Sequence, residues 1–161
     1  MPTPGDLAPD FTLRDQFGQD VSLSGFHGRK AVALLFFPFA FSGVCTGEMA
    51  GIRDRLAEFA TFETEVIGLS CDPVYALRVF ADRDGLHFPL LSDFWPHGAT
   101  AAAYGVFDRE RGCAERTSFV IDKTGIIRWR FASPLPEARN LDDHLSALHE
   151  ALLATDSATE G

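Results

Sequence analysis

Cys45 is the residue of this sequence whose surroundings most favour chemistry. It follows Pro38 and Ser42 in the stretch PFAFSGVC, directly after the apolar run 31–37. If a helix starts here, its free backbone N–H groups and the positive end of its dipole would stabilise a thiolate, which is a nucleophile at neutral pH. The alternative is that Cys45 packs as a small, inert apolar residue. The spacing therefore leaves two hypotheses for Cys45, nucleophile and packing residue.

The elements that must position Cys45 are visible in the hydrophobic pattern. Residues 31–37 form a continuous apolar run and residues 65–70 a second, largely apolar one, as is typical of strands buried on both faces. Between them, residues 48–59 carry apolar side chains at helical spacing, with Ser42 and Gly43 upstream as start signals. This order predicts a parallel strand-helix-strand crossover, with Cys45 where the first strand gives way to the helix.

The remaining pattern predicts antiparallel strands on either side of this unit. Residues 11–13 and 21–23 flank a turn-rich segment and predict an N-terminal β-hairpin, and residues 117–121 and 126–131 predict a second hairpin. Other predicted elements are helices over 73–84, 98–104 and about 141–153, and a short strand over 87–91. Together they indicate an α/β protein with the thioredoxin-like fold, a central mixed sheet flanked by helices.

Length and charge narrow the classes of function. The 161 residues fit one domain, expected over residues 1–154, with residues 155–161 as a flexible C-terminal tail. A net charge of −9 opposes binding to nucleic acid. We see neither a basic and apolar leader nor an apolar run long enough to span a membrane, so we expect a cytoplasmic protein with no membrane partner.

The cysteine and histidine content predicts neither a disulfide framework nor a metal site. The three cysteines, Cys45, Cys71 and Cys113, are widely spaced and form no CxxC pair. The five histidines are scattered, and for His97, as for Phe94 and Trp95, we expect apolar bulk near Cys45 or a subunit contact rather than a metal-binding or catalytic role. We therefore expect no metal and no other cofactor.

The spacing of Pro38, Ser42 and Cys45 matches the Pro-x-x-x-Thr/Ser-x-x-Cys signature of peroxiredoxins. Further segments resemble that family in the same order along nearly the whole chain: APDFTLRDQFGQ, LLFFPFAFSGVCTGE, FPLLSDFWPHGA, AYGVF and ERTSFVIDKTGIIR. Within the family, FSGVCTGE and SDFWPHG most resemble the alkyl hydroperoxide reductase E type, which uses one cysteine.

This resemblance implies a thiol-dependent peroxidase. Cys45 would reduce hydrogen peroxide, organic hydroperoxides and peroxynitrite, and would itself become a sulfenic acid. An external thiol would then reduce the sulfenic acid, with mycothiol, a glutaredoxin-like protein or a thioredoxin-like protein as the implied reductant.

The resemblance also assigns tasks to other residues. Ser42 would hydrogen-bond the thiolate and the peroxide, and Pro38 would shield the sulfur from water. Arg116 would stabilise the thiolate and the charge on the departing oxygen. Glu48 and Arg139 would help to orient that arginine. For these last two the alternatives are an ordinary first-turn carboxylate and a solvated surface charge.

Some positions depart from the family pattern. Ser42 replaces the commoner threonine, and Ala50 stands where one subtype has its resolving cysteine. Cys71 and Cys113 match no familiar resolving position, so we expect both to be packing residues and the enzyme to work with one cysteine. The aromatic residues Phe41, Phe94 and Trp95, expected to be exposed in loops that flank the site, predict a homodimer.

Other functions on the same fold remain open at this point. A thiol-disulfide oxidoreductase normally uses a CxxC pair, which is missing here. A peroxide-sensing redox protein or a chaperone-like binding protein would also carry a reactive Cys45 but would not turn over.

Overall fold

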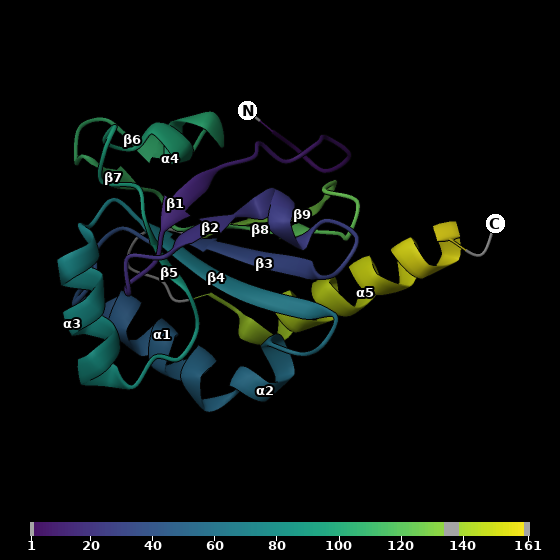
Figure 1. Cartoon of the computed structure of the whole chain (residues 1–161), viewed down its shortest axis with the longest axis horizontal. Coiled ribbons are helices and arrows are strands. Elements are labelled where there is room, and N and C mark those ends of the chain that lie inside the picture. The colour runs from purple at the N-terminus through teal and green to yellow at the C-terminus, as the bar shows by residue number, and fades with distance from the viewer. Residues whose placement is uncertain (1, 134–138, 160–161) are drawn as a thin grey trace.

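A central mixed β-sheet organises the chain (Figure 1). The computed structural model describes the backbone of residues 2–133 and 139–159 and the side chains as far as Leu153. The seven strands have the order β2-β1-β5-β4-β3-β8-β9, and β6 and β7 form a separate two-stranded sheet. The strands are β1 (Thr12–Arg14), β2 (Asp20–Ser22), β3 (Ala31–Phe36), β4 (Thr64–Ser70), β5 (Leu90–Ser92), β6 (Phe107–Asp108), β7 (Cys113–Ala114), β8 (Thr117–Ile121) and β9 (Ile127–Ala132).

Strand register brings the ends of β3 and β4 and the start of β8 to one edge of the sheet. Strands β3, β4 and β5 run parallel, and Phe36 near the end of β3 pairs with Leu69 near the end of β4. Strand β8 runs antiparallel to β3, so its first residue, Thr117, also pairs with Phe36. Residues directly after β3 and directly before β8 therefore meet at this edge.

Helices and the small sheet cover the two faces of the central sheet. The helices are η1 (Leu23–Phe26), α1 (Gly43–Asp54), α2 (Leu56–Phe59), α3 (Val74–Asp84), α4 (Ala99–Ala103) and α5 (Leu141–Thr159). Apolar side chains of α1, α3 and α5 pack against one face, and those of α4 and the β6–β7 region pack against the other. Figure 1 shows α1, α3 and α5 below the sheet and α4 with β6 and β7 above it.

The apolar run at β3 is explained by these two layers. Ala33 and Leu35 belong to the core on the side of α1, whereas Leu34 and Phe36 belong to the core on the side of α4. A strand covered on both faces needs apolar residues at successive positions rather than at alternate ones. The prediction of a doubly buried strand here is confirmed.

Several predicted boundaries differ from the observed ones. The segment predicted as one helix over 48–59 is two helices, α1 and α2, because Arg55 between them has non-helical dihedral angles of −118° and 22°. The strand predicted at 87–91 begins at Leu90, since Pro89 has no N–H to donate to a neighbouring strand. The short sheet of β6 and β7 was not predicted.

The C-terminal helix extends into the segment expected as a flexible tail. Helix α5 continues to Thr159, so the backbone of residues 155–159 is helical, and the flexibility of this segment stays a prediction. The physical reason is that no glycine or proline interrupts residues 141–159. Residues 160 and 161 lie outside the described residues, and the domain boundary at 154 stays a prediction.

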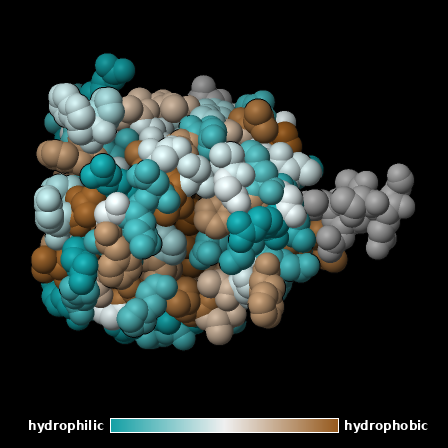
Figure 2. All heavy atoms as spheres, viewed as in Figure 1, coloured by the Kyte–Doolittle hydropathy of each residue, from teal (hydrophilic) through white to brown (hydrophobic). Residues whose placement is uncertain are grey.

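The molecular surface mixes polar and apolar groups. In the view of Figure 2, hydrophobic residues are scattered among hydrophilic ones. Within residues 2–133 and 139–159, no helix combines the length and apolar character needed to cross a membrane.

Candidate active site

Cys45 lies in the first turn of α1, beyond the end of β3. The helix begins at Gly43 with Ser42 as its N-cap, as predicted, and the Cys45 side chain is 0% exposed. The loop before the helix is held in an unusual conformation, because Phe41 has a positive φ of 69°. Its ring packs on Phe80 of α3 with 5.2 Å between centroids. Cys45 therefore lies at a helix start that follows a strained turn, and packing of Phe41 on Phe80 holds this turn in place.

Arg116 reaches the Cys45 sulfur. Its Nη2 donates to Sγ at 3.3 Å, and its side chain is buried. Arg116 directly precedes β8, whose first residue pairs with the end of β3, so the sheet register places the arginine beside the helix start. The expected contact between Arg116 and Cys45 is confirmed. A buried cation at this distance can stabilise negative charge that develops on the atoms beside it.

Glu48 joins Arg116 and Arg139 beneath the sulfur. Its carboxylate accepts a hydrogen bond from Arg116 Nη1, one at 2.8 Å from the Arg139 backbone N–H and one at 3.3 Å from Arg139 Nη1. The Glu48 side chain is 0% exposed and that of Arg139 is 1% exposed. The alternatives of a solvent-facing first-turn carboxylate and a solvated arginine are therefore wrong.

Arg139 is an unusually buried cation. Burial lowers the pKa of its guanidinium to about 10, while Glu48 and Cys45 oppose this effect and Arg116 adds to it. Among the described residues, its Nε and Nη2 have no hydrogen-bond partner. At neutral pH the site thus holds two guanidinium groups against one carboxylate, an excess of positive charge that stabilises an anion on Cys45.

A small pocket opens over the start of the helix. It has a volume of about 220 Å³ and lies where α1 meets the other layer of the protein. Its lining residues are Pro38, Phe39, Ser42, Gly43, Val44, Arg111, Cys113 and Arg116. Three of the residues predicted for the site, Pro38, Ser42 and Arg116, therefore share one pocket, with Cys45 buried beside it.

The Ser42 hydroxyl differs from its expected arrangement. Its single proton is donated to the carbonyl oxygen of Phe39 at 3.0 Å and not to the Cys45 sulfur. Serine lacks the methyl group that restricts the rotamer of threonine, so the hydroxyl can turn back and close the 39–42 turn. The lone pairs of Oγ remain able to accept a hydrogen bond.

Comparison with known proteins agrees with this geometry. The AhpC/TSA family matches residues 4–130. Alkyl hydroperoxide reductase E of Mycobacterium tuberculosis is 50% identical over 125 residues, which cover 78% of this chain and 82% of that protein. The chain is a peroxiredoxin of the alkyl hydroperoxide reductase E type.

Solved structures of peroxiredoxins share the fold. The crystal structure of peroxidoxin BcpB from Mycobacterium tuberculosis is 33% identical, with a TM-score of 0.84 over 93% of this chain and 98% of the other. Enterococcus faecalis AhpC is 26% identical, with a TM-score of 0.87 over 97% and 96% of the two chains. The expected thioredoxin-like arrangement is confirmed.

Cys113 is the residue of this peroxiredoxin whose position the sequence analysis missed. It is buried, as expected of a packing residue, and it also lines the pocket. Its place in the sequence gave no sign of this, because it matches no familiar resolving position. His97 holds the adjoining backbone, since its Nε2 hydrogen-bonds the Gly112 carbonyl oxygen at 2.7 Å. The subunit contact or apolar bulk expected for His97 from the sequence stays a prediction.

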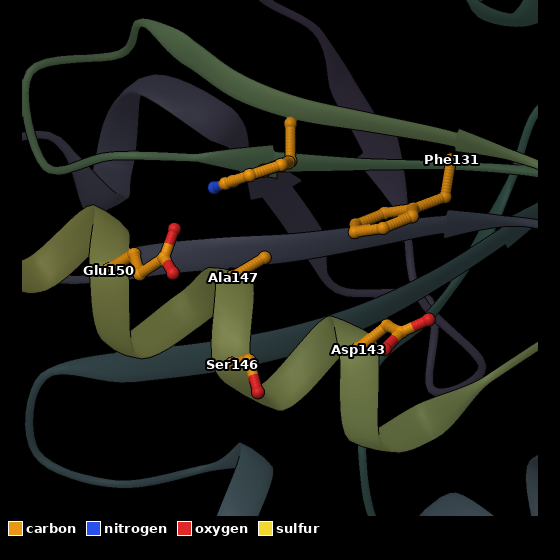
Figure 3. Close-up of a pocket in the computed structure, with 6 residues that line it drawn as sticks. Phe131, Asp143, Ser146, Ala147 and Glu150 are labelled. Atoms are coloured by element: carbon orange, nitrogen blue, oxygen red, sulfur yellow. The ribbon is translucent and has the colours of Figure 1, made fainter.

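A second pocket of the peroxiredoxin lies between β9 and α5 and has a different character. Figure 3 shows the Phe131 ring of β9 facing helix α5, along which Ala147 lies between Glu150 and Asp143. The residues that line it include neither a thiol nor a cation. This pocket therefore lacks both the nucleophile and the anion-stabilising groups present at Cys45.

Proposed function

We propose that this protein is a thiol-dependent peroxidase in which the Cys45 thiolate attacks a peroxide. The sulfur bonds to one peroxide oxygen, the O–O bond breaks, and the other oxygen leaves as water or an alcohol after taking a proton. Cys45 is left as a sulfenic acid. The observation that carries this proposal is the 3.3 Å contact between Arg116 Nη2 and Cys45 Sγ at the start of a helix.

The neighbouring residues have distinct tasks in the proposed reaction. Arg116 stabilises first the thiolate and then the negative charge on the departing oxygen. Glu48 holds Arg116 in position and shares its charge with Arg139. The backbone N–H at the helix start and the Ser42 hydroxyl bind peroxide oxygens, and Pro38 keeps bulk water from the sulfur.

The size of the pocket suits small substrates. A volume of about 220 Å³ suits hydrogen peroxide, peroxynitrite and small organic hydroperoxides. Apolar groups of Pro38, Phe39 and Val44 line it, so an alkyl group can be accommodated beside the reacting oxygens.

An external thiol returns Cys45 to the reduced state. Mycothiol, a glutaredoxin-like protein or a thioredoxin-like protein is the proposed reductant, in the cytoplasm and without a bound cofactor. We also propose a homodimer, because the side chains of Phe94 and Trp95 are 48% and 82% exposed in one loop, and such aromatic surface is typical of interfaces.

The proposed function is tested by peroxide consumption with a supplied thiol reductant. Cys45→Ser should lower kcat/KM by at least roughly 10³-fold, since it removes the nucleophile. Arg116→Gln should lower it by about 10²-fold, as expected for the loss of one donor to a developing anion. Cys71→Ser is the control and should retain wild-type activity, because Cys71 does not line the pocket.

Two results would contradict the proposal. Wild-type rates in the Cys45 variant would remove the assigned nucleophile. A single oxidation of Cys45 without repeated turnover, under excess reductant, would favour the peroxide sensor instead.

A further inference from the structure

The pocket between β9 and α5 has no task in the proposed reaction. It has a volume of about 200 Å³ and is lined by Trp129, Phe131, Asp143, Ser146, Ala147 and Glu150. The first two residues come from β9 and the other four from α5, and none of them lines the pocket beside Cys45. Aromatic rings therefore face carboxylates across one small hollow that is separate from the candidate active site.

Helix spacing brings the two carboxylates of this pocket to one side of α5. Asp143, Ala147 and Glu150 are separated by four and three residues, so they follow one another along one face of the helix. Figure 3 shows Ala147 between the other two. Because alanine has a short side chain, it leaves room above the helix between the two longer side chains. The helix thus presents a hollow with a carboxylate toward each end.

The strand side of the pocket is aromatic. Trp129 and Phe131 are two positions apart on β9, so both side chains lie on the face of the strand that α5 covers. Their ring planes differ by 12°, with 6.2 Å between centroids. The His144 ring stacks on Phe131, whereas Trp129 is 40% exposed. Trp129 therefore offers the more accessible aromatic face, and indole is the aromatic group that attracts cations most strongly.

The charge of the pocket is negative. Asp143 and Glu150 are its only charged lining residues. Within the part of the chain that the structure describes, neither carboxylate forms an ion pair, although the neighbouring Asp142 is paired with Arg55 at 2.8 Å. The two carboxylates of the pocket are thus available to a cation from outside.

The arginines of β9 do not neutralise this charge. Arg128 is paired with Asp122, and the Arg130 guanidinium lies 5.8 Å from the centroid of the Phe119 ring. Phe119 belongs to the core on the other face of the sheet. The whole chain carries a net charge of −9, so the surrounding surface also favours the approach of a cation.

We propose that this pocket binds a small organic cation of the alkylammonium class. The face of an aromatic ring attracts a cation through the ring quadrupole, and the carboxylates add Coulomb attraction. The pocket is smaller than the roughly 300–1,000 Å³ of sites for drug-sized ligands, so its occupant is small. This inference does not rest on the proposed peroxidase function, because the two pockets share no residue.

An inorganic cation suits the pocket less well. Ca²⁺ and Mg²⁺ are coordinated by about six or more oxygen atoms, whereas this pocket offers two carboxylates from positions two helical turns apart. Among the described residues, no group of three or more histidine, cysteine, aspartate or glutamate side chains is placed to hold a metal ion. An alkylated ammonium group instead fills the space with methyl or methylene groups that contact the aromatic rings.

The test titrates choline into the isotope-labelled full chain and follows the indole N–H signals by NMR. Trp95 and Trp129 are the two tryptophans, and Trp95→Phe assigns their signals. Choline should shift the Trp129 signal saturably, with a Kd on the order of 1 mM, because exposed contacts of this kind are individually weak. The Trp95 signal should not move, since Trp95 lies outside this pocket.

The neutral carbon analogue of choline, 3,3-dimethylbutanol, tests the need for positive charge. It has nearly the same shape but lacks the charge, so it should bind at least about fivefold more weakly. Sodium chloride and magnesium chloride at matched ionic strength should not reproduce the shift of the Trp129 signal.

Variants of α5 separate this pocket from the general negative charge of the protein. Asp143→Asn and Glu150→Gln should each raise the Kd for choline about threefold, because each removes one exposed ion pair. Asp142→Asn is the matched control, since it removes the same charge from the same turn, but its side chain is 81% exposed and does not line the pocket. It should leave the Kd unchanged.

Four results would overturn the inference. They are the absence of a saturable shift up to about 100 mM choline, equal affinities for choline and its neutral analogue, an equal rise in Kd for Asp142→Asn and Asp143→Asn, and the same shift with either salt. Circular dichroism checks that each variant is folded. None of these results would bear on the reaction proposed at Cys45.

Discussion

Glu48 and Asp122 are both buried carboxylates that accept hydrogen bonds from arginine, but their partners come from different distances along the chain. Asp122 binds the backbone N–H groups of Thr124 and Ile126 and the side chain of Arg128, all within six residues. Glu48 binds Arg116 and Arg139, which lie 68 and 91 residues away.

The contacts of Asp122 with residues close in sequence stabilise a turn. Burial opposes ionisation of Asp122, but hydrogen bonds from Thr124, Arg128 and the backbone prevail and lower its pKa. The turn also needs Gly125, whose φ is +88° and whose place offers no room for a Cβ beside the His27 ring. The carboxylate therefore stabilises the hairpin of β8 and β9 without touching the pocket.

The contacts of Glu48 with residues distant in sequence form part of the candidate active site. Glu48 is three residues from Cys45 on α1, and both of its arginines influence the charge at the sulfur. Because its partners come from separate elements, Glu48 contributes both to the stability of the fold and to the position of the charges around the sulfur. Perturbing Glu48 should affect stability and activity together, whereas perturbing Asp122 should affect stability alone.

The largest effect is expected for Glu48→Gln. The variant keeps the size of the side chain but leaves two buried guanidinium groups without their counter-charge. The free energy of unfolding should fall by about 3–5 kcal/mol in urea denaturation. Misplacement of Arg116 should lower kcat/KM by about 10²-fold under conditions where the variant is folded. Unchanged activity in a folded Glu48→Gln protein would break the distinction between the two carboxylates.

A smaller effect is expected for Asp122→Asn. The amide oxygen can still accept the hydrogen bonds from the backbone of Thr124 and Ile126, but the amide nitrogen that replaces Oδ2 cannot accept from the half-exposed Arg128, so that pair is lost. The free energy of unfolding should fall by about 1 kcal/mol, with kcat/KM unchanged. Loss of activity without loss of stability would show that this hairpin contributes to the site after all.

The smallest effect is expected for His144, a buried histidine whose pKa is influenced by Arg139, one of the two arginine partners of Glu48. Burial lowers the pKa of His144 below its ordinary value of 6.5, and the charge of Arg139 adds to this effect. Below that value the unfolded chain binds a proton that the native state does not, so stability should fall as the pH is lowered from about 7 to about 5. One proton accounts for at most about 1.4 kcal/mol per pH unit.

The control for this pH effect is His144→Leu. The side chain stacks on the Phe131 ring with 4.5 Å between centroids, so leucine keeps an apolar contact there. Urea denaturation at both pH values should give a smaller drop in stability for the variant than for the wild type. An equal drop would assign the effect to other groups.

The elements around the site were predictable because their signals are local. The continuous apolar run of β3, the helix start at Gly43 and the hairpin turn ending in Gly125 each depend on residues close in sequence. The predicted boundaries of helices and strands differed from the observed ones where tertiary contacts or a single residue ended an element. Examples are Arg55 between α1 and α2 and Pro89 before β5. The motif spacing placed Pro38, Ser42 and Cys45 together, and the family resemblance added Arg116.

By itself, then, the sequence determined where a reactive cysteine would stand: at the junction of a buried strand and a helix, set by hydrophobic periodicity and by residues three and seven positions away. Only the tertiary structure decided what surrounds it. Burial of Arg139 and the place of Cys113 in the pocket depend on strand register and on packing between distant segments. Such contacts leave no periodic trace, because the chain brings the two partners together only after the sheet has formed.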